Sequence, residues 1–263
     1  MNILQEIIAH KHVEVARNKK IVSIKELERS SYMNTSVISM RENLLNKYKS
    51  GIIAEIKRKS PSKGIINGNV NIHKISQGYE KAGVSGISVL TDTNYFGGSN
   101  EDFRQVRKAN SCPMLRKDFM VDEYQILEAK AMGADIILLI AAGIDSKKCL
   151  ELAKFSKSLG LEILLEIHNK KEFETHYNEH VTIVGVNNRN LETFEVSIDV
   201  SKQLASIIPS EITKISESGI SHPDAVIELK KYGYQGFLMG EAFMKQLNPE
   251  ITCEEFINSI TES

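Results

Sequence analysis

Residues 52–64 read IIAEIKRKSPSKG and join an apolar strand to a polar turn. Side chains alternate across a strand, so Glu55 and Lys57 share one face of it. An unpaired buried charge costs roughly several kcal/mol, and stability alone would favour aliphatic residues at inward positions. The turn that follows, which begins at Ser60, has a Ser/Pro/Lys/Gly composition suited to gripping an anion. The segment therefore predicts a strand that carries reactive groups at its carboxyl end.

The same design recurs four times further along the chain. Each copy is an apolar strand that ends in charged or amide side chains: LRKDF at 115–119, LLEIH at 164–168, GVNNR at 185–189 and ISESG at 215–219. Polar groups that end several strands indicate one shared active site.

From residue 51 onward, apolar strands alternate with amphipathic helices. We expect strands near 52–57, 86–90, 114–117, 136–140, 162–167, 183–187, 213–216 and 236–239, and helices that include 72–82, 124–132, 146–159 and 223–232. Eight β-then-α units with short connections imply parallel strands. The length of 263 residues suits one barrel of about 250 residues.

A doubly wound open sheet is the alternative for eight such units. The chain has no G-x-G-x-x-G after its first strand and no G-x-x-x-x-G-K-[ST] motif. Polar residues end five different strands, whereas an open sheet concentrates its site at one switch point. The sequence therefore predicts an α/β fold, a (β/α)8 TIM barrel over residues 51–263 with an N-terminal helical extension over residues 1–50.

The extension differs in character from the barrel. Asn2 can cap a helix whose apolar residues Ile3, Leu4, Ile7 and Ile8 recur at helical spacing. Shorter helices are expected at 24–28 and 41–49. These helices have apolar faces but no β/α partner, so we expect them to pack on the barrel mouth.

Composition excludes several classes of protein. A net charge of −1 and a pI near 6.7 argue against nucleic-acid binding. Three widely spaced cysteines fit reduced thiols in a cytoplasm better than disulfides or a zinc site, and the histidines offer no metal signature. The amino terminus lacks the apolar region of a signal peptide, and no apolar run approaches the ~18 residues of a membrane span. We expect a cytoplasmic protein that binds neither membrane nor metal.

Four residues are candidates for acid–base chemistry. Strand parity places Lys117 inward beside Leu115, and places Glu166 inward at the end of its strand, across from Glu55 and Lys57. Carboxylates and lysines held in one cavity can take different protonation states, as general acid–base catalysis requires. A lysine that reaches solvent and a structural ion-pair network are the alternatives.

A second group of residues suits an anion. Barrels often bind phosphate in the loops after their last two strands, where Gly219, Gly240 and Glu241 lie. Glycines there let backbone N–H groups approach the anion, although they could also simply shape turns. The amide of Asn187 suits a hydroxyl or a carbonyl, and the guanidinium of Arg189 suits a carboxylate, a phosphate or a neighbouring glutamate. The alternative is that Asn187 caps a turn and Arg189 points into solvent.

These motifs together resemble the indole-3-glycerol-phosphate synthase family of tryptophan biosynthesis, in its monofunctional form. The resemblance runs from the N-terminal helices to the last strand, with small departures at Lys59 and at Ser85-Gly86. Its markers are IAEIK at 53–57, SPSKG at 60–64, SVLTD at 88–92, FGGS at 96–99, LRKDF at 115–119, GVNNRNL at 185–191 and SESGI at 216–220.

The resemblance implies ring closure of 1-(2-carboxyphenylamino)-1-deoxyribulose 5-phosphate with loss of carbon dioxide and water, without cofactor or metal. The substrate is a phosphorylated small molecule, and a monomer is expected. The implied roles are a proton donor at Lys117, a base at Glu166 supported by Glu55, and a carboxylate holder and possible second donor at Lys57. Substrate contacts follow at Asn187, Arg189, Glu217 and Ser218, and phosphate contacts at Ser60, Gly219, Gly240 and Glu241.

Two other functions are the rivals of this reading. Phosphoribosylanthranilate isomerase is a barrel of the same pathway, but it would use a Cys/Asp pair, and Cys112 here precedes its strand instead of ending it. The other rival is a catalytically inactive barrel that binds sugar phosphates. The presence of Lys117, Glu166 and Lys57 argues against it.

Overall fold

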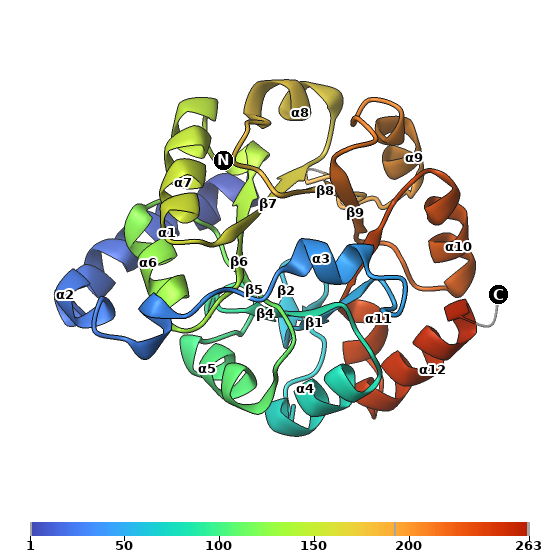
Figure 1. Ribbon diagram of the computed structural model, residues 1–263, viewed down its shortest axis with the longest axis horizontal. Helices are drawn as coiled ribbons and strands as arrows, with labels where there is room; N and C mark the ends of the chain where they lie inside the picture. The colour runs from blue at the N-terminus through green and yellow to red at the C-terminus, as the bar shows by residue number, and fades with distance from the viewer. Residues whose placement is uncertain (1, 192, 262–263) are drawn as a thin grey trace.

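The computed structural model describes residues 2–191 and 193–261, within which eight parallel strands form a closed barrel (Figure 1). Around the ring the order is β1-β10-β9-β8-β7-β6-β5-β4. The predicted TIM barrel is confirmed. The strands are β1 (Ile52–Ile56), β4 (Gly86–Leu90), β5 (Met114–Lys117), β6 (Ile136–Ile140), β7 (Glu162–Ile167), β8 (Ile183–Asn187), β9 (Thr213–Glu217) and β10 (Gly236–Met239).

Alternation along each strand divides its residues between two cores. Inward side chains fill the barrel, and outward ones pack under the surrounding helices. Leu115 lies inside while Met114 lies outside, so the parity predicted for Lys117 is correct. The interior aliphatic cluster comprises Ile53, Leu115, Ile136, Leu138, Leu164, Ile183, Ile215 and Leu238.

Helices lie outside the ring, between successive strands (Figure 1). Local signals set their ends: Asp122 forms a capping box with Gln125, and Pro223 opens its helix. A two-stranded hairpin, β2 (Lys59–Ser60) with β3 (Gly64–Ile65), follows β1. The helices are α4 (Ile72–Lys81), α5 (Asn100–Ala109), α6 (Glu123–Ala131), α7 (Ser146–Ser158), α8 (Lys170–His176), α9 (Asp199–Ala205), α10 (Pro223–Lys231), α11 (Glu241–Met244) and α12 (Pro249–Thr261).

The N-terminal segment reaches both ends of the barrel. It contains α1 (Ile3–Ile21), α2 (Ile24–Leu27), a 3₁₀ turn (Ser31–Asn34) and α3 (Met40–Leu45), which is shorter than the expected 41–49. Figure 1 shows α3 across the centre of the ring, where Met40 and Leu44 join the interior cluster. In contrast, α1 supplies Leu4 and Ile7 to a cluster at the carboxyl ends of the strands.

Glu162 explains how α3 is held at the amino-terminal end of the strands. Its carboxylate accepts hydrogen bonds from Ser39 Oγ at 2.5 Å and from the Met40 and Arg41 backbone N–H groups at 2.8 and 3.1 Å. These are N–H groups that a helix start leaves without intrahelical partners. Glu162 thus shares the inward face of β7 with Glu166 but serves the opposite end of the barrel. Among the helices of the described residues, none has the length and apolar character to span a membrane.

Candidate active site

One cavity opens at the carboxyl ends of the strands, and it brings together every residue that the sequence singled out. Glu55 and Lys57 come from β1, Lys117 from β5 and Glu166 from β7, while the later strands and their loops supply the rest. The predicted residues that line the cavity are Glu55, Lys57, Ser60, Lys117, Glu166, Asn187, Arg189, Glu217, Ser218, Gly219, Gly240 and Glu241.

Lys117 lies at the centre of the charged groups. Its Nζ is 2.9 Å from Glu166 Oε2 and 3.5 Å from Glu217 Oε2. Burial alone would lower the pKa of Lys117, but the carboxylates of Glu166, Glu217 and Glu55 outweigh it and raise that pKa above its usual value. The lysine is therefore held as a charged ammonium that can donate a proton or a hydrogen bond.

Glu166 is held in the ionised state. Asn187 Nδ2 donates a hydrogen bond to its Oε1 at 3.0 Å, and His168 Nε2 lies 3.7 Å from the same oxygen. Burial alone would raise the pKa of Glu166, but Lys117, His168 and the Asn187 hydrogen bond lower it. A buried, oriented carboxylate of this kind can accept a proton from a bound molecule.

Glu217 is a second carboxylate beside the same lysine, with the opposite tendency. Burial, with repulsion from Glu166 and Glu55, raises its pKa despite the nearby Lys117. Among the residues that the structure describes, its Oε1 has no hydrogen-bond partner. Gly185 makes room for this side chain, because a Cβ there would lie 2.2 Å from Oε1. Paired carboxyls driven to different protonation states are typical of acid–base sites.

Glu55 and Lys57 form the next pair around the ring. Lys57 Nζ lies 2.7 Å from Glu55 Oε1, with 18% of the lysine side chain exposed. Gly240 allows this arrangement, because a Cβ at that position would lie 2.7 Å from Glu55 Oε1. Lys57 thus faces the cavity as a second cation with access to water.

The loop after β9 has an unusual backbone. Ser218 and Gly219 have consecutive φ values of 66° and 74°, a region that L-residues other than glycine rarely occupy. Asn188 Nδ2 donates a hydrogen bond to the Ser218 carbonyl at 3.0 Å and holds the loop. A Cβ at Gly219 would lie 2.3 Å from Val196 Cγ1, so no larger residue fits without movement. Strained backbone of this kind clusters at ligand sites.

Across the cavity from β5, cations surround Glu241, the first residue of α11. Its carboxylate oxygens lie 3.9 Å from Lys63 Nζ and 3.9 Å from an Arg189 Nη. The side chain of Glu241 therefore faces two cations, which leaves its backbone N–H as the group suited to an anion. Lys63 belongs to the SPSKG motif at 60–64, but that motif predicted no role for it.

The apolar wall of the cavity was not predicted from the sequence. It includes Leu4 and Ile7 from α1, with Phe119, Phe96 and Leu191 from loops after the strands. Phe96 and Phe119 contact each other, with ring centroids 5.8 Å apart. The sequence shows the apolar face of α1, and Phe96, Phe119 and Leu191 all lie in the motifs quoted above. No neighbouring residue in the sequence indicates that these side chains lie beside the charged groups.

Comparison with known proteins gives matches along nearly the whole chain. The model of the family described as indole-3-glycerol phosphate synthase matches residues 4–256. A protein of that name from Bacteroides thetaiotaomicron is 44% identical, with 98% of this chain and 99% of that protein covered. Another from Caldanaerobacter subterraneus subsp. tengcongensis is 41% identical, with 98% of each chain covered.

Solved structures show the same fold at low identity. A tryptophan synthase α-subunit variant from Pyrococcus furiosus matches with a TM-score of 0.61 at 13% identity, covering 82% of this chain and 99% of that one. A structure titled native KDPGal matches with a TM-score of 0.57 at 13% identity, covering 80% and 92%. The family model matches nearly the whole chain, and the two named relatives are more than 40% identical to it. The chain therefore belongs to the indole-3-glycerol phosphate synthase family.

Proposed function

We propose that this protein closes the indole ring of 1-(2-carboxyphenylamino)-1-deoxyribulose 5-phosphate, with loss of carbon dioxide and water, to give indole-3-glycerol phosphate for tryptophan biosynthesis. The observation that carries the proposal is the contact between Lys117 and Glu166, 2.9 Å apart in the cavity, with the lysine charged and the glutamate ionised. Family membership supplies the reaction, and this contact supplies an acid and a base for it.

The cavity offers complementary surfaces to the two ends of this substrate. Backbone N–H groups at Gly219, Gly240 and Glu241, with the Ser60 hydroxyl, would hold the phosphate. Leu4, Ile7 and Phe119 would cover the aromatic ring, and Lys57 would hold its carboxylate. Asn187, Ser218, Glu217 and Arg189 line the same cavity, and we assign to them the contacts with the hydroxyl groups of the sugar chain.

Lys117 acts first, during ring closure. The aromatic carbon that bears the carboxylate attacks the substrate carbonyl carbon, and Lys117 gives a proton to the carbonyl oxygen as the new bond forms. Carbon dioxide then leaves, and its bonding electron pair restores the aromatic ring. The lysine acts from the first bond onward, so its loss affects every later step.

Dehydration then completes the indole. The new hydroxyl leaves as water with a proton that we assign to Lys57, and Glu166 removes one proton from the five-membered ring. Glu166 can return that proton to Lys117, 2.9 Å away. Lys57, which reaches solvent, takes up one proton. The cycle consumes one proton in total, as it must when a carboxylate anion becomes neutral carbon dioxide.

Turnover of the substrate is the test. The purified protein mixed with the carboxyphenylamino sugar phosphate should generate indole fluorescence, and the Lys117→Met variant should not. Binding of the substrate without any indole product from the wild type would instead make the protein a sugar-phosphate-binding barrel, contrary to the proposal.

We also propose that the protein works as a monomer in a reducing cytoplasm. One chain supplies the residues named above for both ends of the substrate. Cys112, Cys149 and Cys253 are buried free thiols. Light scattering under assay conditions should give the mass of one chain, and a stable dimer would contradict the proposal.

A further inference from the structure

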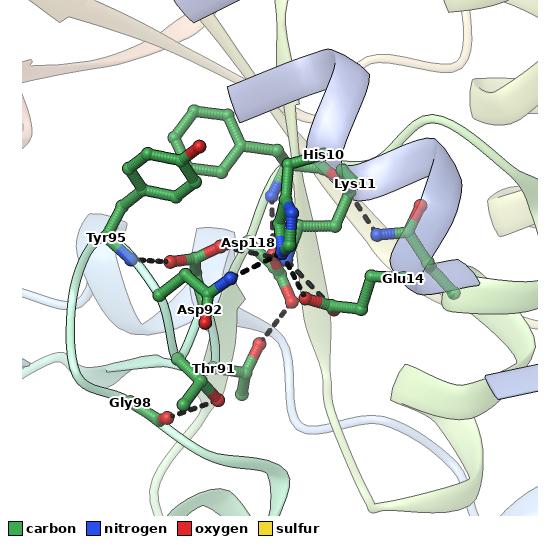
Figure 2. Close-up of polar contacts among 12 residues, drawn as sticks. His10, Lys11, Glu14, Thr91, Asp92, Tyr95, Gly98 and Asp118 are labelled. Atoms are coloured by element: carbon green, nitrogen blue, oxygen red, sulfur yellow. Dashed lines mark hydrogen bonds and ion pairs between the residues drawn. The ribbon is translucent and has the colours of Figure 1, made fainter. Parts of the chain in front are cut away.

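A fully buried lysine on α1 lies outside the proposed chemistry. Lys11 has 0% of its side chain exposed, and its Nζ lies 2.9 Å from Asp92 Oδ2 and 2.9 Å from Asp118 Oδ1. Glu14, one turn further along α1, is 3.0 Å away. Figure 2 shows Lys11 pointing from α1 towards the two aspartates, of which Asp92 lies in the loop after β4 and Asp118 directly follows β5.

Each aspartate also shapes the loop that carries it. Asp92 Oδ1 accepts hydrogen bonds from the backbone N–H groups of Tyr95 and Phe96 at 2.7 and 3.2 Å. Asp118 Oδ1 accepts from the Phe119 N–H at 2.8 Å, and its Oδ2 accepts from the Thr91 hydroxyl at 2.6 Å. The aspartates therefore set the positions of the loops that place Phe96 and Phe119 in the cavity wall.

Lys11 joins those loops to the rest of the apolar wall. Leu4, Ile7 and Lys11 are spaced at i, i+3 and i+7, so they lie on one face of α1. Leu4 and Ile7 pack against Phe119, which directly follows Asp118. The ammonium group thus ties the helix that carries one half of the wall to the loops that carry the other half.

A buried ion pair is poor evidence of stabilisation, because well-packed apolar residues often serve a fold as well. Its clearest use is to specify one arrangement. An apolar residue at position 11 could slide along the barrel rim, whereas an ammonium held by two oriented carboxylates allows one register for α1. Burial alone would lower the pKa of Lys11, but Asp118, Asp92 and Glu14 raise it, so the charge persists.

We propose that Lys11 is a positioning residue, which locks α1 over the cavity so that Leu4 and Ile7 close the wall against the aromatic ring of the substrate. The inference rests on the proposed function, because that reaction supplies the aromatic ring. Lys11 touches no reacting atom. Its effect reaches the substrate through the wall and not through the phosphate loops on the other side of the cavity.

The chain offers a matched control on the same helix. Lys19 also joins α1 to the barrel, through an ion pair of 2.8 Å with Asp122, but it lies two turns further on and 43% of its side chain is exposed. Neither Lys19 nor Asp122 lines the cavity. Lys11→Met and Lys19→Met therefore each remove an ammonium group from α1. Lys11→Met does so beside the apolar wall, and Lys19→Met does so far from it.

The test compares two ligands that use different parts of the cavity. For each variant we would measure the KM for the substrate and the inhibition constant of inorganic phosphate. In Lys11→Met the KM should rise about tenfold or more, as expected when an aromatic group loses part of its apolar cover. Phosphate inhibition should stay within about twofold of wild type, and Lys19→Met should leave both values within that range.

A second variant covers the case in which Lys11→Met leaves too little folded protein. Lys11→Met with Asp92→Asn removes one of the stranded charges and keeps hydrogen-bonding atoms in place, and thermal melting would establish that it folds. A raised KM with unchanged phosphate inhibition in this folded double variant supports the proposal.

Three results would overturn it. One is a wild-type KM in either folded variant. Another is an equal loss of affinity for substrate and phosphate, which would indicate general damage. The third is failure of both variants to fold, which would make Lys11 a residue of the core. If the wild type itself makes no indole product in this assay, the proposed function fails, and that outcome is distinct from all three.

Discussion

Two lysines in this molecule sit among carboxylates at 2.9 Å, yet their surroundings differ. Lys11 is sealed, and both oxygens of Asp92 and of Asp118 lie against a backbone N–H, a hydroxyl or the ammonium. Lys117 faces the cavity with 14% of its side chain exposed. Its neighbours Glu166 and Glu217 also line the cavity, whereas neither Lys11 nor Asp92 does.

The difference separates architecture from chemistry. A charge cluster that is sealed away from the cavity has nothing to offer a ligand, and so it can only fix the positions of the elements that carry it. A cluster that lines the cavity keeps its donors and acceptors available to a ligand, at some cost in stability. We therefore expect substitutions around Lys117 to affect turnover more than folding, and substitutions around Lys11 to do the reverse.

Removal of the ammonium at the cavity should have the largest effect. Lys117→Met keeps much of the side-chain volume but cannot donate a proton, so turnover should fall by about 10²–10⁴-fold, the usual contribution of a positioned acid. Steady-state assays by indole fluorescence, with Lys19→Met as the control, measure this loss. A decrease of only a few-fold would reassign the acid to Lys57. It would also contradict the catalytic role that distinguishes Lys117 from Lys11.

Loss of the base should be nearly as severe but should appear later in the reaction. Glu166→Gln retains the shape and the contact with Asn187 but cannot accept a proton. We expect a fall of about 10²-fold or more in kcat with little change in KM, as when transition-state stabilisation alone is lost. Rapid quench should show carbon dioxide released before indole appears. Poor substrate binding with normal turnover at saturation would make Glu166 a binding residue and point to Glu55 as the base.

The anion loops should respond independently of both lysines. Gly219→Val places a side chain on a left-handed backbone and against Val196, so the loop must move. Binding of substrate, product and inorganic phosphate should all weaken by about tenfold, roughly the loss of one good hydrogen bond to a charged group. Unchanged phosphate inhibition would place the anion site elsewhere.

Glu217 offers the smallest and most specific test. Because the folded state raises its pKa, the folded protein holds this proton more tightly than the unfolded chain, and stability falls as the pH rises through that range. Glu217→Gln removes this loss. The variant should be more stable than wild type by on the order of 1–2 kcal/mol near pH 8, with a smaller gain near pH 5. Urea unfolding at both pH values measures the gain, and a gain that is larger at low pH would refute the assignment.

The sequence predicted the barrel because its signals are local. Apolar strands, amphipathic helices and strand parity define the β/α units, and the same parity predicted that Lys117 and Glu166 point into the barrel. The structure differs from those expectations mainly at helix ends, such as α3, which ends at Leu45.

Contacts between distant segments were not predictable in this way. Nothing near Lys11 in the sequence points to Asp92 or Asp118, and nothing in residues 39–41 points to Glu162. The protonation of Glu217 depends on Glu166, Glu55 and Lys117, which come from three other strands. Such features arise only once the barrel has closed.

Equilibrium unfolding in urea of Lys11→Met and Lys117→Met, beside the wild type in one buffer, tests the contrast most directly. We predict that Lys11→Met loses about 3–5 kcal/mol, the range for a broken buried ion pair. Lys117→Met should lose less than Lys11→Met, because the carboxylates that it leaves behind line the cavity and Glu217 holds its proton readily. Equal losses, or a larger loss in Lys117→Met, would contradict the division of the two clusters into architecture and chemistry.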